Sequence, residues 1–132
     1  MSLNSQAQKS IDWAVLGKVS FTSTYDESSQ QYIEKPEYAP SVTALNKQSV
    51  TIRGYVMPLD AIGEQYILSG LPYSSCFFCG GGGIETVLEL ELANKNLSFD
   101  LDEVITFQGT FYLNDDPLGL LYQLKAAKPV KE

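Results

Sequence analysis

Apolar and polar residues alternate along several short segments of this chain, and such alternation predicts β-strands. Residues 49–59 show the pattern most clearly, because Val50, Ile52 and Val56 share the predicted inner face while Met57 points outward. The β-branched residues in this segment also favour the pleated, half-buried surface of a sheet. It is the clearest predicted strand in the sequence.

A second strong strand is predicted at residues 86–92, where three leucines face inward and Val87, Glu89 and Glu91 face outward. Such a strand has one face on the core and one face in solvent. Glu89 and Glu91 are then explained as a solvated face rather than a catalytic pair. Three weaker strand patterns complete the set, at residues 64–69, 104–113 and 118–126.

The order of these strands indicates a small barrel. Five strands with a longer polar connector at residues 93–103 match the Greek-key barrel called the OB-fold. Gly54 and Gly109 interrupt strands at mid-length, where strongly coiled strands need bends. A small β-sandwich is the alternative. We therefore expect a mostly β fold, a five-stranded OB-like Greek-key barrel.

The region before the barrel is predicted to add a short N-terminal helix and a hairpin extension. Ser10 is a candidate N-cap for a helix that ends at Gly17. Residues 19–25 alternate as a strand, and residues 31–34 return as a second strand. This second strand is expected to stop before Pro36, because proline has no amide donor for a sheet ladder.

The first ten residues are predicted to lie outside the fold. Met1–Leu3 resembles an expression leader, and residues 4–10 are polar, as a segment exposed by signal-peptide removal would be. No apolar run reaches the roughly 20 residues needed to cross a bilayer. We expect residues 1–10 to be a flexible leader and residues 11–132 to be a single barrel domain.

Composition narrows the classes of function. The net charge of −7 argues against binding to nucleic acid and against adsorption to an anionic membrane, and it is compatible with a basic or cationic partner. The chain has no His, which removes the usual general base and the commonest metal ligand. A Ser-His-Asp or Cys-His catalytic centre within one chain is therefore excluded, and we favour a binding protein over an enzyme.

Both cysteines lie in one unusual segment, residues 74–83, which reads Ser-Ser-Cys-Phe-Phe-Cys followed by four glycines. Glycine loses more backbone entropy on folding than any other residue, so this run indicates a tight turn, a close approach or mobility. Cys76 and Cys79 then have four interpretations. They form a local disulfide, a redox-active pair, half of a metal site, or idle thiols in a barrel turn.

The surroundings of the cysteines favour the structural interpretations, a disulfide or idle thiols. A redox pair needs its first Cys near a helix N-terminus, whereas glycines and a strand follow here. A structural zinc site needs four ligands, so Cys76 and Cys79 need carboxylates such as Glu85 or the Cys pair of a second chain in a homodimer. The glycines also lack the Lys-Ser/Thr pair and helix of a phosphate-binding loop.

Other candidate chemistry is less specific. The eight tyrosines suit the binding face of an OB-fold, but packing at barrel rims and hairpins explains them more simply. Asp100 and Asp102 begin the alternating pattern of a calcium loop, which the following residues do not complete. Neither feature predicts a site by itself.

Two segments carry a family resemblance. Leu45–Leu59, which contains Val-Thr-Ile-Arg-Gly-Tyr-Val-Met-Pro-Leu, together with Ser74–Gly80 and Glu85, resembles uncharacterised bacterial exported proteins known as domains of unknown function with an OB-like barrel. The resemblance covers about the last two-thirds of the chain. It implies export to the periplasm or cell surface, no established activity, and a link to cation handling. Ile84 stands where the family pattern has Pro. The turn before Glu85 is therefore expected to differ in geometry from that of the family.

These expectations combine into one leading hypothesis, an exported, non-enzymatic binding or accessory module for an unknown protein or small ligand. The alternatives are a structural or protein-interaction domain with a disulfide or idle thiols, and a thiol redox protein. Cys76 and Cys79 are the candidate metal ligands, and zinc is the candidate metal. The candidate ligand-binding loop consists of Cys76, Phe77, Phe78, Cys79, Gly80 and Glu85.

Overall fold

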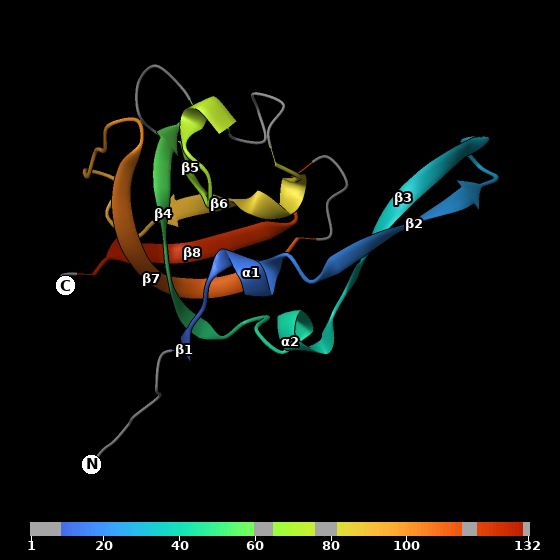
Figure 1. Cartoon of the computed structure of the whole chain (residues 1–132), viewed down its shortest axis with the longest axis horizontal. Coiled ribbons are helices and arrows are strands. Elements are labelled where there is room, and N and C mark those ends of the chain that lie inside the picture. Colours follow the sequence, from blue (N-terminus) through green and yellow to red (C-terminus); the bar gives the residue numbers. More distant parts are fainter. Residues whose placement is uncertain (1–8, 60–64, 76–81, 115–118, 131–132) are drawn as a thin grey trace, which may run out of the picture.

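Figure 1 shows the computed structural model of the chain, which describes residues 9–59, 65–75, 82–114 and 119–130. Most of these residues belong to β-strands, and the helices among them are short. No helix in these ranges has the length and apolarity that spanning a bilayer requires. A closed barrel and a projecting two-stranded ribbon make up the fold.

The barrel confirms the predicted five-stranded OB-like fold. β7 (Glu103–Leu113) pairs with β4 (Ser49–Pro58) and so closes the sheet. Neighbouring strands are antiparallel, except that β6 (Val87–Leu92) and β8 (Tyr122–Pro129) run parallel. This strand order, with a parallel pair between the third and fifth barrel strands, is the Greek-key arrangement expected from the sequence and excludes the β-sandwich. The order around the barrel is β4 (Ser49–Pro58), β5 (Tyr66–Ser69), β6 (Val87–Leu92), β8 (Tyr122–Pro129) and β7 (Glu103–Leu113).

The main core fills the barrel with the residues that the alternation predicted, including Val50, Ile52 and Val56 of β4. Gly54 continues this inner face, and its missing side chain lets β5 approach closely. A Cβ at Gly54 would lie 2.6 Å from the carbonyl oxygen of Ser69. The predicted mid-strand glycine is therefore a packing requirement of the barrel wall.

Two residues predicted to face solvent are buried instead. Met57 and Val87 form a second small cluster with Ile67 on the outer face of β4, β5 and β6. Leu120, from the segment before β8, packs against this cluster and covers it. The prediction was wrong because alternation identifies the two faces of a strand but does not show that a distant loop covers the second one.

The last strand lies later in the chain than predicted. β8 runs from Tyr122 to Pro129 rather than over residues 118–126. Before it, the side-chain amide of Asn114 donates to the carbonyl of Leu120 at 2.8 Å, so this carbonyl bonds to a side chain instead of to a neighbouring strand. Ala126 then forms a bulge, and the register of β8 shifts at this point against both β6 and β7. The strand continues beyond the bulge instead of ending there.

The N-terminal helix is present but is capped by a different residue. α1 (Trp13–Leu16) has Asp12 as its N-cap, and the carboxylate of Asp12 accepts a hydrogen bond from the amide of Val15 at 3.0 Å. Ser10, the predicted cap, instead belongs to β1 (Lys9–Ser10), which pairs in parallel with β4. Asp has the same preference for N-cap positions as Ser, so the chain offered two competing caps.

The predicted hairpin is the projecting ribbon of Figure 1, formed by β2 (Val19–Asp26) and β3 (Gln31–Tyr38). β3 passes through Pro36, where the sequence predicted an end. The amide of Ala39 donates to the carbonyl of Lys18 at 2.9 Å, which makes this directly opposed pair a hydrogen-bonded one. Since bonded and non-bonded pairs alternate, Pro36 occupies a non-bonded position, and its missing amide costs no ladder bond.

After the ribbon the chain turns back towards the barrel. α2 (Pro40–Thr43) is a single helical turn that begins with Pro40, where proline is well tolerated. Val42 of this turn and Leu45 after it are buried in the main core. The base of the ribbon is therefore fixed to the barrel, whereas its tip extends away from it (Figure 1).

Candidate functional site

The two ends of the predicted binding loop lie next to each other. η1 (Tyr73–Ser75) precedes it and η3 (Ile84–Thr86) follows it. The amide of Gly82 donates to the carbonyl of Ser75 at 3.3 Å, so these two described residues on either side of residues 76–81 are neighbours. Ile84, where the family resemblance expected Pro, begins η3 and packs against the main core.

Most of the predicted site residues lie outside the described part of the chain. The predictions of a disulfide or a zinc site at the two cysteines therefore stay predictions. Within the ranges that the structure describes, no group of three or more His, Cys, Asp or Glu residues could hold a metal ion. The predicted site residues that lie outside the described residues are Cys76, Phe77, Phe78, Cys79 and Gly80.

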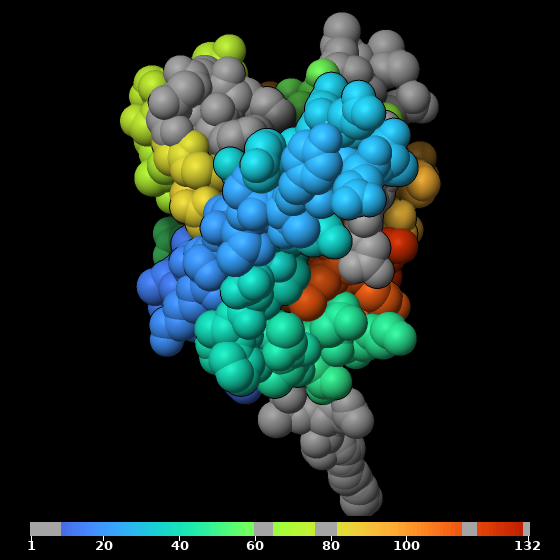
Figure 2. Space-filling view, turned by 90° about the vertical axis from the view of Figure 1, so that its right-hand side faces the viewer, coloured from blue at the N-terminus to red at the C-terminus, as the bar shows by residue number. Residues whose placement is uncertain are grey.

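Glu85, the remaining member of the predicted site, lines a cleft between the ribbon and the barrel. This ribbon cleft has a volume of about 840 Å³. Gly83 and Ile84 line it beside Glu85, so one wall of the cleft is the chain that directly follows the glycine run. Figure 2 looks onto this side of the molecule, where the blue-to-cyan ribbon passes in front of the barrel.

The ribbon supplies the opposite wall, mainly through β3. Phe21 of β2 and Pro36 of β3 are directly opposed in the ribbon, and both line the cleft. Ile33 and Tyr38 line it as well. Phe21 and Ile33 keep 42% and 37% of their surface exposed, which shows that apolar side chains here remain available to a ligand.

Leu120 and Leu121 form the floor of the cleft on the barrel side. Leu121 belongs to the main core, and Leu120 covers the second cluster, so both are held by packing beneath the cleft. Asn114 borders the same floor, and its backbone amide donates to the carbonyl of Leu121 at 2.9 Å. This wall of the cleft is consequently packed against both core clusters.

The charged groups at the cleft are two carboxylates and one amine. Glu34 and Glu85 line it together with Lys35. The Glu85 carboxylate is close enough to the buried Tyr122 to contribute to its raised pKa, although burial of the phenol is the larger cause. The Tyr122 hydroxyl donates to the carbonyl of Leu16 at 2.6 Å, so it belongs to the core rather than to the cleft.

Small-molecule sites in proteins are typically clefts of roughly 300–1,000 Å³ with apolar walls and a few polar groups. The ribbon cleft matches this description in volume and in lining. It brings together side chains from β2, β3, η3 and the segment before β8. The described lining residues include no Ser, Thr, Cys or His, so they do not form a Ser–His or Cys–His pair.

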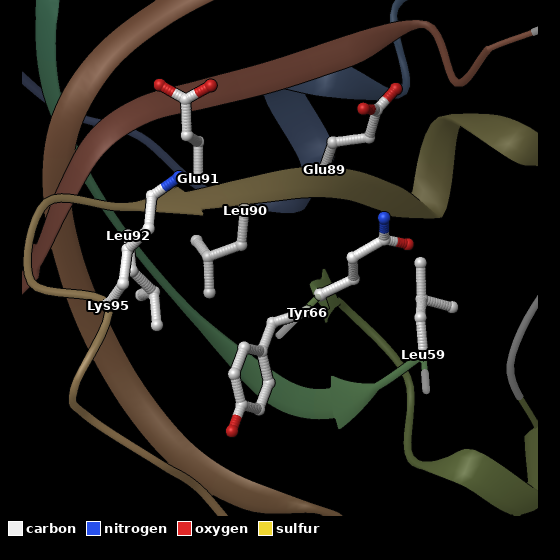
Figure 3. Close-up of a pocket in the computed structure, with 8 residues that line it drawn as sticks. Leu59, Tyr66, Glu89, Leu90, Glu91, Leu92 and Lys95 are labelled. Atoms are coloured by element: carbon white, nitrogen blue, oxygen red, sulfur yellow. The ribbon is translucent and has the colours of Figure 1, made fainter. Parts of the chain in front are cut away.

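A smaller cavity of about 490 Å³ lies along β6, and Figure 3 shows its lining. Leu90 and Leu92 point to one side of β6 while Glu89 and Glu91 point to the other, which confirms the predicted faces. Tyr66, Leu90 and Leu92 in this lining are core residues that are less than a tenth exposed, whereas Leu59 keeps 49% of its surface exposed. The cavity is smaller than the ribbon cleft and offers less apolar surface to a ligand. The ribbon cleft is therefore the stronger candidate site.

Sequence reasoning missed the ribbon half of the cleft. It placed the site in one loop, whereas Phe21 and Ile33 lie more than forty residues earlier in the chain. The sequence feature that could have indicated it is the presence of single apolar residues, such as Phe21 and Ile33, in two strands that otherwise consist largely of Ser, Thr and charged residues. The tyrosines divide as well: Tyr66 and Tyr122 pack in the core rather than at a barrel rim or hairpin, while Tyr32 is 73% exposed at the ribbon tip.

Comparisons with known proteins add one finding about the fold. No family profile matches the chain, and no curated protein matches it in sequence. Among solved structures, the chain is similar to the crystal structure of a DUF3299 family protein from Pseudomonas aeruginosa PAO1, with a TM-score of 0.59 and 15% sequence identity. The similarity covers 96% of this chain and 99% of that one. The chain therefore has the fold of a protein from a family of unknown function.

Proposed function

We propose that this protein is an exported, non-enzymatic binding module whose ligand occupies the ribbon cleft. The observation that carries the proposal is the cleft of about 840 Å³ with apolar walls from four separate parts of the chain. A binding site of this kind needs a pre-formed apolar surface that is partly open to solvent. Phe21 and Ile33 supply such a surface, because each is fixed in a strand yet remains more than a third exposed.

The charges of the cleft define the class of ligand. Glu34 and Glu85 outnumber Lys35 at its edge, and the whole chain carries a net charge of −7. Partners are selected by complementary potential, and the surrounding field raises the local concentration of cations. The preferred ligand is therefore a molecule with an apolar body and a cationic group.

A fluorescence titration with the neutral apolar probe N-phenyl-1-naphthylamine tests the apolar part of this proposal. Phe21→Ala removes a ring from the cleft wall, and we expect it to weaken probe binding about tenfold. Tyr25→Ala is the matched control, because it removes an aromatic ring of similar exposure from the same face of β2 outside the cleft. Equal affinities for the wild type and Phe21→Ala would contradict the proposal.

Competition experiments test the charge preference. Hexylammonium and hexanoate have the same short apolar tail and opposite charges, so the wild type should release the probe at lower concentrations of hexylammonium. Glu85→Gln should reduce this preference by about threefold or more while leaving the neutral probe bound. A preference for hexanoate, or no effect of Glu85→Gln on the preference, would reject the cationic ligand class.

Export to the periplasm or cell surface is part of the proposal and is supported by the family resemblance stated above. In an oxidising compartment Cys76 and Cys79 are expected to form a local disulfide. Fractionation of the native cells, with thiols alkylated before lysis, tests both points by mass spectrometry. We expect the protein in the exported fraction with neither cysteine alkylated, and a cytoplasmic, doubly alkylated protein would contradict both.

Zinc binding is the second version of the cysteine proposal. Because one chain supplies only two thiolates, a site would join Cys76 and Cys79 with those of another copy. Native mass spectrometry of the reduced protein during zinc titration decides between the versions. One zinc per two chains, lost in Cys76→Ser, supports the metal version, and no zinc uptake rejects it.

A further inference from the structure

The outer edge of β2 carries backbone groups with no strand beside them. In the described part of the chain, β2 pairs with β3 alone. The bonded pair Lys18–Ala39 sets the alternation of the ribbon ladder. It follows that the odd-numbered residues of β2 direct their amides and carbonyls away from β3. These residues are Val19, Phe21, Ser23 and Tyr25.

This edge lacks the features by which proteins usually prevent strand pairing. Edge strands are commonly protected by charged residues, proline, bulges or short length. β2 is eight residues long, pairs with β3 without a bulge, and has no charged residue or proline between Val19 and Tyr25. The outer edge of β3 is different, because Glu34 and Pro36 both lie at its outward-facing positions. Only one edge of the ribbon is open to another strand.

We propose that β2 pairs with β2 of a second copy of this chain, in antiparallel orientation, to form a four-stranded sheet across a twofold axis. Residues 20–25 are exposed along their full length, so a partner strand has access to this edge. An isolated two-stranded ribbon is marginally stable in water, and a sheet of more strands gives it lasting order. A twofold axis requires a surface that complements itself.

The sequence of β2 complements itself in one register. If Thr22 lies opposite the partner's Thr22, then Phe21 faces the partner's Ser23 and Val19 faces the partner's Tyr25. These are pairs of outward-directed residues, so each exchanges two backbone hydrogen bonds, about eight in total across the axis. A direct Thr–Thr pair at the centre is among the favourable cross-strand contacts.

Charge complementarity selects this register over its neighbours. The same alignment places Lys18 opposite the partner's Asp26, and it does so twice because of the twofold axis. Hydrogen bonds from the hydroxyls of Ser29 and Ser28 lower the pKa of Asp26, which keeps its carboxylate ionised. Within one chain Lys18 and Asp26 stand about 26 Å apart along an extended strand, too far for a direct pair.

Sedimentation velocity over a range of protein concentrations tests this proposal. We expect reversible dimers in the wild type. Ser23→Pro removes an outward amide at a position that, like Pro36, makes no hydrogen bond within the ribbon ladder, so the ribbon itself should remain intact. It should weaken dimerisation by at least about tenfold. Ser23→Thr keeps the amide and is the control, which should dimerise like the wild type.

A charge exchange tests the register itself. Lys18→Glu and Asp26→Lys each create two like-charge pairs, one at each end of the proposed interface, and each should self-associate several-fold more weakly than the wild type at low salt. An equimolar mixture of the two variants pairs Glu with Lys and Lys with Asp, and it should restore dimers. If a single substitution weakened the dimer by destabilising its own chain, mixing the two variants would not restore dimers. Recovery on mixing therefore identifies the charge pairs as the cause.

Three outcomes would overturn the inference: a monomeric wild type at millimolar concentration, full dimerisation of Ser23→Pro, or a mixture of the charge variants that associates no better than either alone. The test is separate from that of the ribbon cleft. Ile33→Ala changes a cleft residue of β3, away from the proposed interface, so it should dimerise normally while weakening binding of the apolar probe. Ser23→Pro should keep the probe while losing the dimer.

Discussion

Trp13 shows how single residues hold the N-terminal helix on the barrel. Its indole Nε1 donates to the carbonyl of Arg53 at 2.7 Å. Its ring packs so closely over Gly70 that a Cβ there would lie 2.7 Å from the Trp13 Cγ atom. The same ring lies near Gly54, so two glycines make room for one aromatic side chain between β4 and the end of β5.

The contacts of Gly54 lead to a stability prediction. Gly54→Ala places a methyl group 2.6 Å from the Ser69 carbonyl oxygen, and backbone cannot move aside cheaply, so we expect a loss of about 2–3 kcal/mol in unfolding free energy. Gly17→Ala is the matched control. Its Cβ would meet nothing closer than 3.5 Å, and its φ of −75° suits alanine, so stability should stay equal or rise slightly. Urea unfolding measures both, and equal stability of the two variants would contradict this account of Gly54.

Tyr122 gives a second prediction at this scale. Burial raises the pKa of its phenol above the ordinary value of 10.0, with Tyr38 and Glu85 as smaller causes. The folded state therefore keeps this proton when the unfolded chain loses it, so the stabilisation is complete below pH 10 and is lost as pH rises further. Tyr122→Phe also leaves the buried Leu16 carbonyl without its donor, at a cost of about 1–3 kcal/mol.

The measurement for Tyr122 is the difference in unfolding free energy between wild type and Tyr122→Phe. We expect a constant difference between about pH 7 and pH 9 and a shrinking one above pH 10. The other tyrosines are present in both proteins and cancel in the difference. A difference in unfolding free energy that grows above pH 10 would contradict this account, because it would mean that the folded state favours the ionised phenol.

The structural roles of some single residues were predicted from the sequence, and those of others were not. Gly54 and Gly109 were identified as bend positions, because glycine inside a strand is a visible signal. The bulge opposite Gly109 falls on Ala126, whose φ is +54°, and alanine gives no signal for a left-handed conformation. Asp12 replaced Ser10 as the helix cap for a similar reason, since both residue types cap helices equally well.

At the scale of elements, the barrel strands were predictable and the ribbon was only partly so. Alternation gave the core faces of β4 and β6 directly. Pro36 suggested an early end to β3, but proline interrupts a ladder only where its amide would be used. Whether a position is bonded depends on register, which a single strand does not reveal.

The ribbon should be separable from the barrel. Only its base, Val19 and Tyr38, packs against the main core, and the residues between are largely exposed. Replacing residues 21–36 by a short Gly-Ser linker should therefore leave a barrel that unfolds cooperatively, with a melting temperature within a few degrees of the wild type. Calorimetry measures this, and a variant without a cooperative transition would show that the ribbon is part of the folding unit.

At the scale of the whole molecule, the candidate site draws on more parts of the chain than the sequence indicated. The loop prediction reached Glu85, at one wall of the cleft. It did not reach Phe21 or Ile33, because the approach of a ribbon to a barrel is a tertiary arrangement without a local pattern. The acidic composition, in contrast, was informative at once and agrees with the carboxylates at the cleft.

The central claim is that ligands bind between the ribbon and the barrel. The most direct test is an isotope-filtered NOE spectrum of the labelled protein with N-phenyl-1-naphthylamine bound. We predict NOEs from the naphthalene ring to the methyl groups of Ile33, Ile84 and Leu120. NOEs to Leu59 and Leu92 instead would place the ligand in the smaller cavity along β6 and contradict the account.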